Sequence, residues 1–313
     1  MMANRLNTSM SPDPAVIHEI ATELGIAPAF VEKDWYAVQV LKCISLHQSD
    51  SIATIFSGGT SLSKAYGLIQ RFSEDLDFRC RYNSDNTTSQ NKKIRSSYRK
   101  QIVAEISGLE SIILNDNSIQ KASNYIKFPL RYPQHYKNHR ALRPTLELEF
   151  SFTQPRLEPH SQVIQSWVAQ FMGAEPEATI LCLSPIETAA DKVSALTWRV
   201  LKRDRKSASD DPTMIRHLHD LSALVDTISN NKDLFVDTTR LAFDEDQRTG
   251  KRNTHKAFHQ SMQLSLEKLR SESEYPQEYT RFVDAMSYAD DEDTITFSDA
   301  IANYEYLISL FKQ

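Results

Sequence analysis

The chain has 313 residues, which is enough for one large hydrophobic core or two smaller ones, and the length favours two domains. It is 40% hydrophobic and 25% charged, as is ordinary for a globular protein. The net charge of −5 argues against a protein that binds nucleic acid over its whole surface. Three scattered cysteines without a CxxC pair indicate neither a disulfide framework nor a zinc site. Without an apolar signal core or a run of 18 apolar residues, we expect a cytoplasmic protein and no membrane partner.

Two helices are expected at the N-terminus. Asp13 and Pro14 are typical of a helix start, and apolar residues with helical spacing follow over 15–24, up to Gly25. A second helix is predicted over 28–46, where apolar side chains recur every three or four residues.

A pair of glycines then joins a predicted strand to a predicted helix. Gly58 and Gly59 are two of only seven glycines, and they follow the apolar run 52–56 and precede the helical pattern 62–69. Glycine lets the backbone approach a ligand closely, and a helix N-terminus offers unpaired N–H groups to phosphate. Taken alone, however, a Gly-Gly pair is more often a tight turn.

Two aspartates follow in a second strand-like run. Asp75 and Asp77 alternate with Leu76 and Phe78, so both carboxylates lie on one face of the predicted strand. This arrangement can hold divalent cations against the phosphates of a nucleotide, although an Asp-x-Asp is often a solvated strand face. The glycine pair and the aspartates together, in this order, favour a nucleotide-transfer site.

A strand pair is predicted further along, after an amphipathic helix whose outer face is basic (residues 92–109). Residues 126–132 and 146–152 each alternate apolar with polar side chains. Glu147 and Glu149 lie on the polar face of the second strand, where one of them could join the aspartates as a third carboxylate. Glutamates on such a face also occur without any function.

Basic residues are unevenly distributed. Residues 121–143 contain six Lys or Arg, two His, three Tyr and no acid, and residues 92–100 contain five Lys or Arg and no acid. A basic, tyrosine-bearing surface on an acidic protein favours local contact with a polyanion such as RNA. The alternative is a set of solvated charged faces.

The second half of the chain is predicted to be helical. Ser184, Pro185 and Glu187 form a capping box with proline in the first turn, so a helix begins there and runs to about Lys202. Five further helical stretches are predicted at 214–228, 233–243, 254–270, 277–289 and 297–311.

Five motifs in this order resemble those of the AbiEii/AbiGii-type toxins, a branch of the polymerase β-like nucleotidyltransferase superfamily. The motifs are VEKDWYAVQVL (31–41), SGGTSLSKAYGLIQRFSEDLDF (57–78), RPTLELEFSF (143–152), ETAADKVSAL (187–196) and IRHLHDL (215–221). They are spread over residues 31–221, which is most of the chain.

The resemblance implies an α+β fold with the mixed sheet of these nucleotidyltransferases, flanking helices and a helical C-terminal domain. We divide the chain into a nucleotidyltransferase domain (1–165) and a mainly helical domain (166–313) that contributes Lys192 and Asp220 to the cleft. The implied function is that of a toxin that transfers nucleotides from an NTP to RNA, with the tRNA acceptor end as the expected acceptor, and so blocks translation. A cognate antitoxin is the implied protein partner.

The resemblance also implies roles for individual residues. Asp75, Asp77 and Glu149 are expected to be ligands of a two-Mg²⁺ site, with Glu149 preferred to Glu147. Lys192 is expected to neutralise triphosphate charge, and Asp220 matches the final aspartate of the last motif, although His217 stands where the family often has Asp. The remaining residues expected to bind the nucleotide are Ser57, Gly58, Gly59, Thr60, Lys64, Arg71 and Ser73.

Other functions remain open from the sequence. Related enzymes modify small molecules such as antibiotics, or proteins, with the same core motifs, and a degenerate interaction module is a further alternative. The HLHD run at 217–220 is similar to HD-type phosphohydrolases, which need additional His and Asp ligands. His135 and His139 have the spacing of a metal pair on a helix, but they lie in a predicted basic loop.

Overall fold

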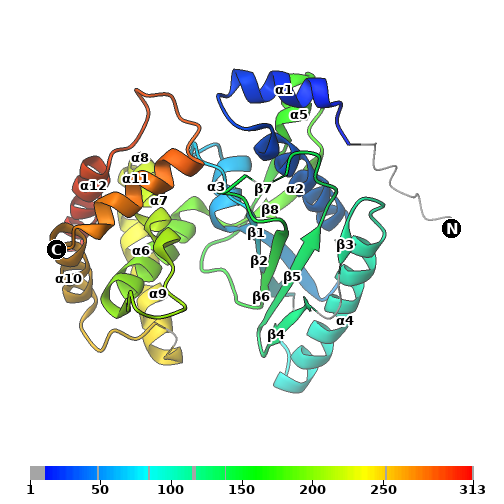
Figure 1. Ribbon diagram of the computed structural model, residues 1–313. Helices are drawn as coiled ribbons and strands as arrows, with labels where there is room; N and C mark the ends of the chain where they lie inside the picture. Colours follow the sequence, from blue (N-terminus) through cyan, green and yellow to red (C-terminus); the bar gives the residue numbers. More distant parts are fainter. Residues whose placement is uncertain are drawn as a thin grey trace. The chain divides into compact units, whose positions relative to one another are not determined.

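The computed structural model describes residues 11–47, 49–83, 85–114, 118–137, 139–250 and 252–311. These residues form two compact units (Figure 1). Unit 1 contains the described residues of Met1–Tyr66 and Phe72–Leu183, and unit 2 contains those of Gly67–Arg71 and Ser184–Gln313. The main boundary therefore follows Leu183, whereas the sequence suggests a division at 165/166.

Unit 1 is built on a mixed sheet with the strand order β3-β5-β6-β2-β1-β8-β7, and β4 pairs with β5 beside this path. β2 is antiparallel to β1 and parallel to β6, while β1 is parallel to β8. The predicted strand pair is confirmed, because β5 and β6 are antiparallel with Phe128 opposite Leu148. The strands are β1 (Ile52–Ser57), β2 (Asp75–Tyr82), β3 (Ile113–Leu114), β4 (Gln120–Ala122), β5 (Tyr125–Arg131), β6 (Leu146–Ser151), β7 (His160–Ile164) and β8 (Ala178–Cys182).

One face of this sheet is apolar and forms the core of unit 1. Phe78 of β2 stacks on Phe150 of β6 with ring centroids 4.8 Å apart, and Tyr98 of α4 packs edge-on against Phe150. Buried side chains of α2 and α4 complete this core. Because side chains alternate along a strand, the residues between these apolar positions face the other side of the sheet. The helices of unit 1 are α1 (Pro14–Glu23), α2 (Pro28–Leu46), α3 (Gly58–Lys64), α4 (Thr88–Ser107) and α5 (Trp167–Phe171).

The helix after the glycine pair is shorter than predicted. α3 ends at Lys64, and Gly67 adopts a φ of +63°, a left-handed conformation that interrupts the helix before Ile69. Arg71 then forms an isolated bridge with Ser287, so this connection packs with the C-terminal helices of unit 2.

Residues 160–182 also differ from the helical expectation. They form β7, α5 and β8, and β8 extends the sheet by pairing Cys182 with Phe56 of β1. These strands have five residues each, and β7 is mostly exposed. They are therefore too short and too polar to give a clear period of two in the sequence.

Unit 2 is helical in its described residues, as predicted, and α6 packs against α7, α9 and α10. Val193, Leu196 and Val200 of α6 are fully buried there. The helices are α6 (Pro185–Lys202), the 3₁₀ turn η2 (Pro212–Ile215), α7 (Arg216–Ala223), α8 (Val225–Ser229), α9 (Lys232–Thr249), α10 (Phe258–Ser271), α11 (Glu274–Met286) and α12 (Phe297–Ser309).

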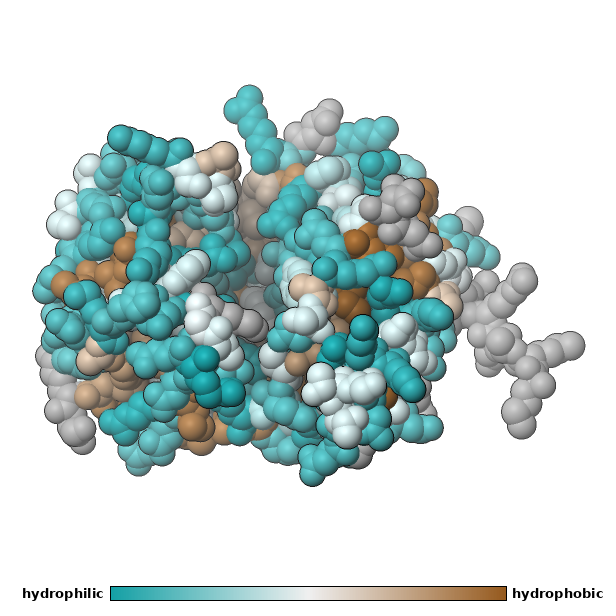
Figure 2. Space-filling view, turned by 90° about the horizontal axis from the view of Figure 1, so that it is seen from below, coloured by the Kyte–Doolittle hydropathy of each residue, from teal (hydrophilic) through white to brown (hydrophobic). Residues whose placement is uncertain are grey.

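Hydrophilic side chains predominate on the face drawn in Figure 2, with smaller hydrophobic areas between them. The large apolar side chains that stay exposed come from separate elements: Leu46, Ile113, Val163, Phe171, Met172, Leu234 and Leu241. Among the described residues, no helix has the length and apolar character needed to span a bilayer.

Candidate active site

The centre of the candidate site is the contact between the glycine turn and β2. Gly58 has a φ of +76°, and a Cβ atom placed on it would lie 2.1 Å from Oδ2 of Asp77. Only glycine leaves room for this carboxylate, and only glycine adopts this φ without strain. The turn and the second aspartate are therefore packed directly against each other, as the order of the motifs in the sequence suggests.

Four carboxylates lie side by side on the polar face of the sheet. β2 and β6 are parallel, with Asp75 in register with Glu147 and Asp77 in register with Glu149. Neighbouring strands are about 4.8 Å apart, so each pair of carboxylates lies within reach of a shared ion. Glu149 is therefore the glutamate beside Asp77, whereas Glu147 lies beside Asp75.

A polar row crosses four strands at the level of Asp77. Lys127 of β5 is opposite Glu149, Glu149 is beside Asp77, and Asp77 is opposite Ser57 of β1. Lys127 Nζ lies 2.7 Å from Glu149 Oε1 and 3.3 Å from Glu147 Oε2. Burial would lower the pKa of Lys127, but the two glutamates outweigh it and raise the pKa. Lys127 is therefore firmly cationic and neutralises part of the acidic cluster.

A second cation contacts the other end of the cluster. Arg143 Nη1 donates to Asp75 Oδ1 at 2.8 Å, and 48% of the Arg143 side chain remains exposed. Thr145 Oγ1 donates to Glu147 at 2.6 Å. In this arrangement the described residues contain no preformed group of three or more His, Cys, Asp or Glu side chains around a common point. The donor set nevertheless fits Mg²⁺, because hard carboxylate oxygens of Asp75, Asp77 and Glu149 share one face.

The hydroxyl groups of the glycine turn bind the backbone of β2. Thr60 Oγ1 donates to the carbonyl oxygen of Asp75 at 2.5 Å, and Ser57 Oγ donates to that of Asp77 at 3.2 Å. Both side chains are buried. They join the start of α3 to the two residues that carry the aspartate carboxylates, so they fix the turn against the strand.

The other predicted nucleotide-binding residues of unit 1 have different surroundings. The Lys64 ammonium pairs with Asp34 of α2 and lies 4.3 Å from the centroid of the Trp167 ring, which anchors α3 to its neighbours. Gly59 is buried at the start of α3, and Ser73 is half-buried just before β2.

Arg71, Lys192 and Asp220 form a buried cluster in unit 2. Arg71 binds Asp220 with two hydrogen bonds of 2.6 Å, and Lys192 Nζ lies 2.6 Å from Oδ2 of the same carboxylate. Burial would raise the pKa of Asp220, but the charges of Arg71 and Lys192 hold this pKa well below its usual range. One carboxylate thus pairs with two basic side chains, and burial lowers the pKa of Lys192 from its ordinary value.

His217 lies near this cluster, where the family often has an aspartate. Burial, followed by the charge of Lys192, moves the pKa of His217 well below its ordinary value, so the ring is neutral at pH 7. Its Nδ1 is buried without a hydrogen-bond partner. His219 packs against Tyr279 and Phe282. No cluster of metal-ligand type includes these histidines among the described residues, which gives the HD-type alternative no support.

Sequence reasoning missed the roles of Arg143, Lys33 and Glu74 and assigned Lys127 only to RNA. Lys33 is fully buried, and its ammonium pairs with Glu74. The signal in the sequence was the charged run Glu32-Lys33-Asp34 inside an otherwise apolar helix. The partners of such a run cannot be read from local pattern.

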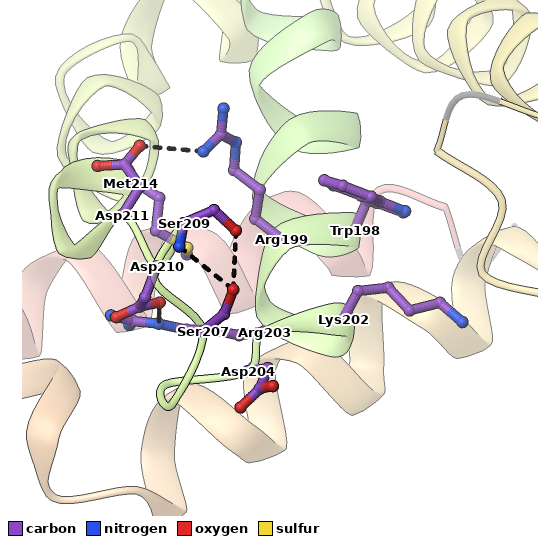
Figure 3. A pocket seen from close by; sticks show the side chains of 10 residues that line it. All are labelled: Trp198, Arg199, Lys202, Arg203, Asp204, Ser207, Ser209, Asp210, Asp211 and Met214. Atoms are coloured by element: carbon purple, nitrogen blue, oxygen red, sulfur yellow. Dashed lines mark hydrogen bonds and ion pairs between the residues drawn. The ribbon is translucent and has the colours of Figure 1, made fainter.

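Unit 2 also contains a polar pocket beside the C-terminal end of α6 (Figure 3). Trp198 and Lys202 point away from the serine hydroxyls of the pocket, whereas Arg199 and Arg203 are paired with Asp211 and Asp210. Ser207 and Ser209 hydrogen-bond each other at 2.8 Å. Because these polar groups satisfy one another, we do not place the chemistry here. The lining residues are Trp198, Arg199, Lys202, Arg203, Asp204, Ser207, Ser209, Asp210, Asp211 and Met214.

The mixed sheet presents carboxylates beside a Gly-Gly turn, which is the arrangement that the resemblance to nucleotidyltransferases implies. A sequence profile of the family described as "Nucleotidyl transferase AbiEii toxin, Type IV TA system" matches residues 39–303. The chain belongs to this family and is therefore a nucleotidyltransferase toxin of a type IV toxin–antitoxin system, with an NTP as substrate and an antitoxin as partner.

The structure is similar to that of MenT4, the nucleotidyltransferase toxin of Mycobacterium tuberculosis H37Rv. The TM-score is 0.52 with 15% sequence identity, over 95% of this chain and 99% of that chain. At this identity the likeness shows the fold, and it confirms the predicted fold class. No curated protein matches the sequence significantly.

The contact between Gly58 and Asp77 gives a direct prediction. Gly58→Ala is expected to reduce nucleotide transfer about 10- to 100-fold, since the new methyl group must displace the Asp77 carboxylate. Gly25→Ala is the matched control: its φ of +64° gives similar backbone strain, but nothing lies within 4 Å of the added Cβ. Both variants are compared by thermal melting and by transfer rate. Equal activities of the two variants would show that the contact has no role in transfer.

Proposed function

We propose that the polar face of β2 and β6 binds Mg²⁺ and the triphosphate of an NTP. The observation that carries this proposal is the packing of Gly58 against Asp77, with Glu149 in register beside that aspartate. Asp75, Asp77 and Glu149 would hold the metal, which would stabilise the negative charge of the reacting phosphate oxygens.

The residues of the chain have separate tasks in this proposal. The backbone of Gly58 and Gly59 lets the phosphates approach β2 closely. Glu149 accepts the proton of the attacking hydroxyl or completes the metal ligands, and Lys127 Nζ holds the Glu149 carboxylate in place from 2.7 Å away. Lys127 and Arg143 contact these carboxylates and would also attract the triphosphate, whose negative charge suits both cations.

We propose that unit 2 supplies further positive charge through Lys192. Asp220 is fully buried and contacts Lys192 and Arg71, so its task is to position these two cations. Two basic side chains on one carboxylate favour an anionic ligand. Lys192 then neutralises the triphosphate as a point charge.

The proposed acceptor is RNA, with the tRNA acceptor end as the expected site of addition, which would block translation. Support comes from the basic segment 121–143, in which Lys121, Arg131, Lys137 and Arg140 are exposed. The alternative acceptors are a small molecule such as an antibiotic, or a protein.

The direct test is label transfer. The protein is incubated with Mg²⁺, total RNA and each labelled NTP in turn, and the products are separated by size. Label in RNA of tRNA length is the expected result. Label only in protein or in small molecules would contradict the RNA proposal and favour the alternative acceptors.

Charge reversal on the exposed basic segment should separate the acceptors further. Arg131, Lys137 and Arg140 are exposed, whereas Lys127 is occupied by Glu149 and is left unchanged. Their triple change to Glu is expected to weaken RNA binding and to flatten its salt dependence by about 0.7 to 0.9 for each phosphate that the protein no longer neutralises. RNA affinity is measured against KCl concentration.

The control for this experiment reverses the same number of charges on a helix of unit 2, outside both basic segments. Lys232, Arg240 and Arg248 of α9 are exposed, and their change to Glu alters the net charge by the same amount. The salt slope of this variant should match that of the wild type. Parallel slopes for all three proteins would argue that the segment 121–143 does not hold RNA.

A further inference from the structure

α2 carries three consecutive charged residues in the interior of unit 1. Glu32, Lys33 and Asp34 are 1%, 0% and 2% exposed. Buried charges are costly unless each one is paired and hydrogen-bonded. The contacts of these residues should therefore show what the run does.

Lys33 belongs to a small network of hydrogen bonds and ion pairs around Arg143. Its ammonium pairs with Glu74 and donates to the carbonyl oxygen of Arg143 at 2.8 Å. The same carboxylate oxygen of Glu74 accepts a hydrogen bond of 2.7 Å from the backbone N–H of Arg143. Lys33 and Glu74 thus hydrogen-bond the carbonyl oxygen and the N–H of the Arg143 backbone, respectively.

This network surrounds Asp75. Glu74 directly precedes Asp75 in the chain, and the Arg143 guanidinium donates to the Asp75 carboxylate at 2.8 Å. Asp75 is therefore fixed through its backbone from one side and through its side chain from the other. The network is buried at Lys33 and opens toward solvent at Arg143, whose side chain is 48% exposed.

We propose that Lys33 is a positioning residue that sets Asp75 and Arg143 for metal and nucleotide binding. The inference rests on the proposed function, because it takes Asp75 and Asp77 as metal ligands. Mg²⁺ demands near-ideal octahedral geometry, so small shifts of a carboxylate weaken its binding. Lys33 contacts neither substrate nor metal and acts only through Glu74 and Arg143.

The test is metal binding to the full chain without NTP, with Mn²⁺ as the probe and electron paramagnetic resonance as the readout. Lys33→Met combined with Glu74→Gln removes both charges while it keeps the side-chain volumes, so no single charge is left buried. We expect Mn²⁺ binding to weaken on the order of tenfold, with a corresponding rise in the Mg²⁺ concentration that gives half-maximal transfer.

The matched control is Glu32→Gln in the same helix. Glu32 is equally buried and accepts hydrogen bonds from the backbone amides of His135 and Tyr136. These two residues lie in the connection between β5 and β6 that also contains Arg143, but they do not adjoin Asp75 in the network of Lys33. This variant should be less stable yet keep its Mn²⁺ affinity. An equal decrease in affinity in both proteins would overturn the inference, because it would reflect loosening of the connection in general.

Two further variants keep the result decisive. If the double variant does not fold, Glu74→Gln alone should weaken Mn²⁺ binding in the same direction by a smaller factor, and wild-type affinity would overturn the inference. Asp77→Asn tests the underlying site. If Asp77→Asn binds Mn²⁺ like the wild type, the proposed metal site fails; if only Asp77→Asn loses affinity, the site stands and the role of Lys33 fails.

Discussion

Asp77→Asn is expected to lower nucleotide transfer by about 10³-fold or more while the protein remains folded. The substitution keeps the size of the side chain that packs against Gly58, so the turn stays in place. It removes the negative charge beside Glu149 and with it one ligand of the proposed metal site. The measurement is the initial rate of NTP incorporation under saturating Mg²⁺, together with the thermal melting curve. Asp75→Ala should be similarly inactive, since its carboxylate belongs to the same face.

The control for this prediction is a carboxylate outside the cluster. Glu158 is exposed and pairs with Arg81, which lies on the same strand and polar face as Asp77. Glu158→Gln therefore removes one negative charge near β2 without touching the proposed ligands, and it should retain wild-type rates. Full activity of purified, folded Asp77→Asn would refute the metal assignment.

The sequence predicted the parts of the site that depend on local pattern. The strand, the Gly-Gly turn and the alternation around Asp75 and Asp77 follow from short-range chemistry. The same alternation predicts that Glu149 lies on the polar face of its strand. The preference for Glu149 over Glu147 came from the family resemblance, and the parallel register of β6 with β2 brings Glu149 beside Asp77. The fold class was also predicted correctly from the family resemblance.

Long-range pairing could not be predicted in this way. Lys33 and Arg143 are 110 positions apart, and nothing local indicates that a buried lysine in α2 holds the backbone beside Asp75. Lys127 is a further example, because the sequence places it in the basic segment 121–143 but does not indicate that strand pairing brings it opposite Glu149. The end of α3 at Lys64 likewise depends on Gly67 and on packing in unit 2, which override helical spacing.

The second large effect on nucleotide transfer is expected at Lys192. The charge of this residue can be removed without leaving Asp220 unpaired. Asp220 keeps both hydrogen bonds from Arg71 when Lys192 is neutralised. The side chain of Lys192 is only 8% exposed, so methionine is a better replacement than alanine, which would leave a cavity. The substitution removes one basic group from the cluster while the packing is preserved.

Lys192→Met is expected to reduce kcat on the order of 10²-fold, because the positive charge that we propose Lys192 presents to the triphosphate would act most strongly as charge develops in the transition state. Lys192→Arg should recover only part of this activity, since the guanidinium differs in shape and reach. Lys202→Met, on the exposed end of the same helix, is the matched control and should leave kcat unchanged. The three proteins are compared by steady-state kinetics with varied NTP. If Lys192→Met is folded and has wild-type kinetics, Lys192 only balances the charge of Asp220, and the contribution of unit 2 to transfer must come from other residues.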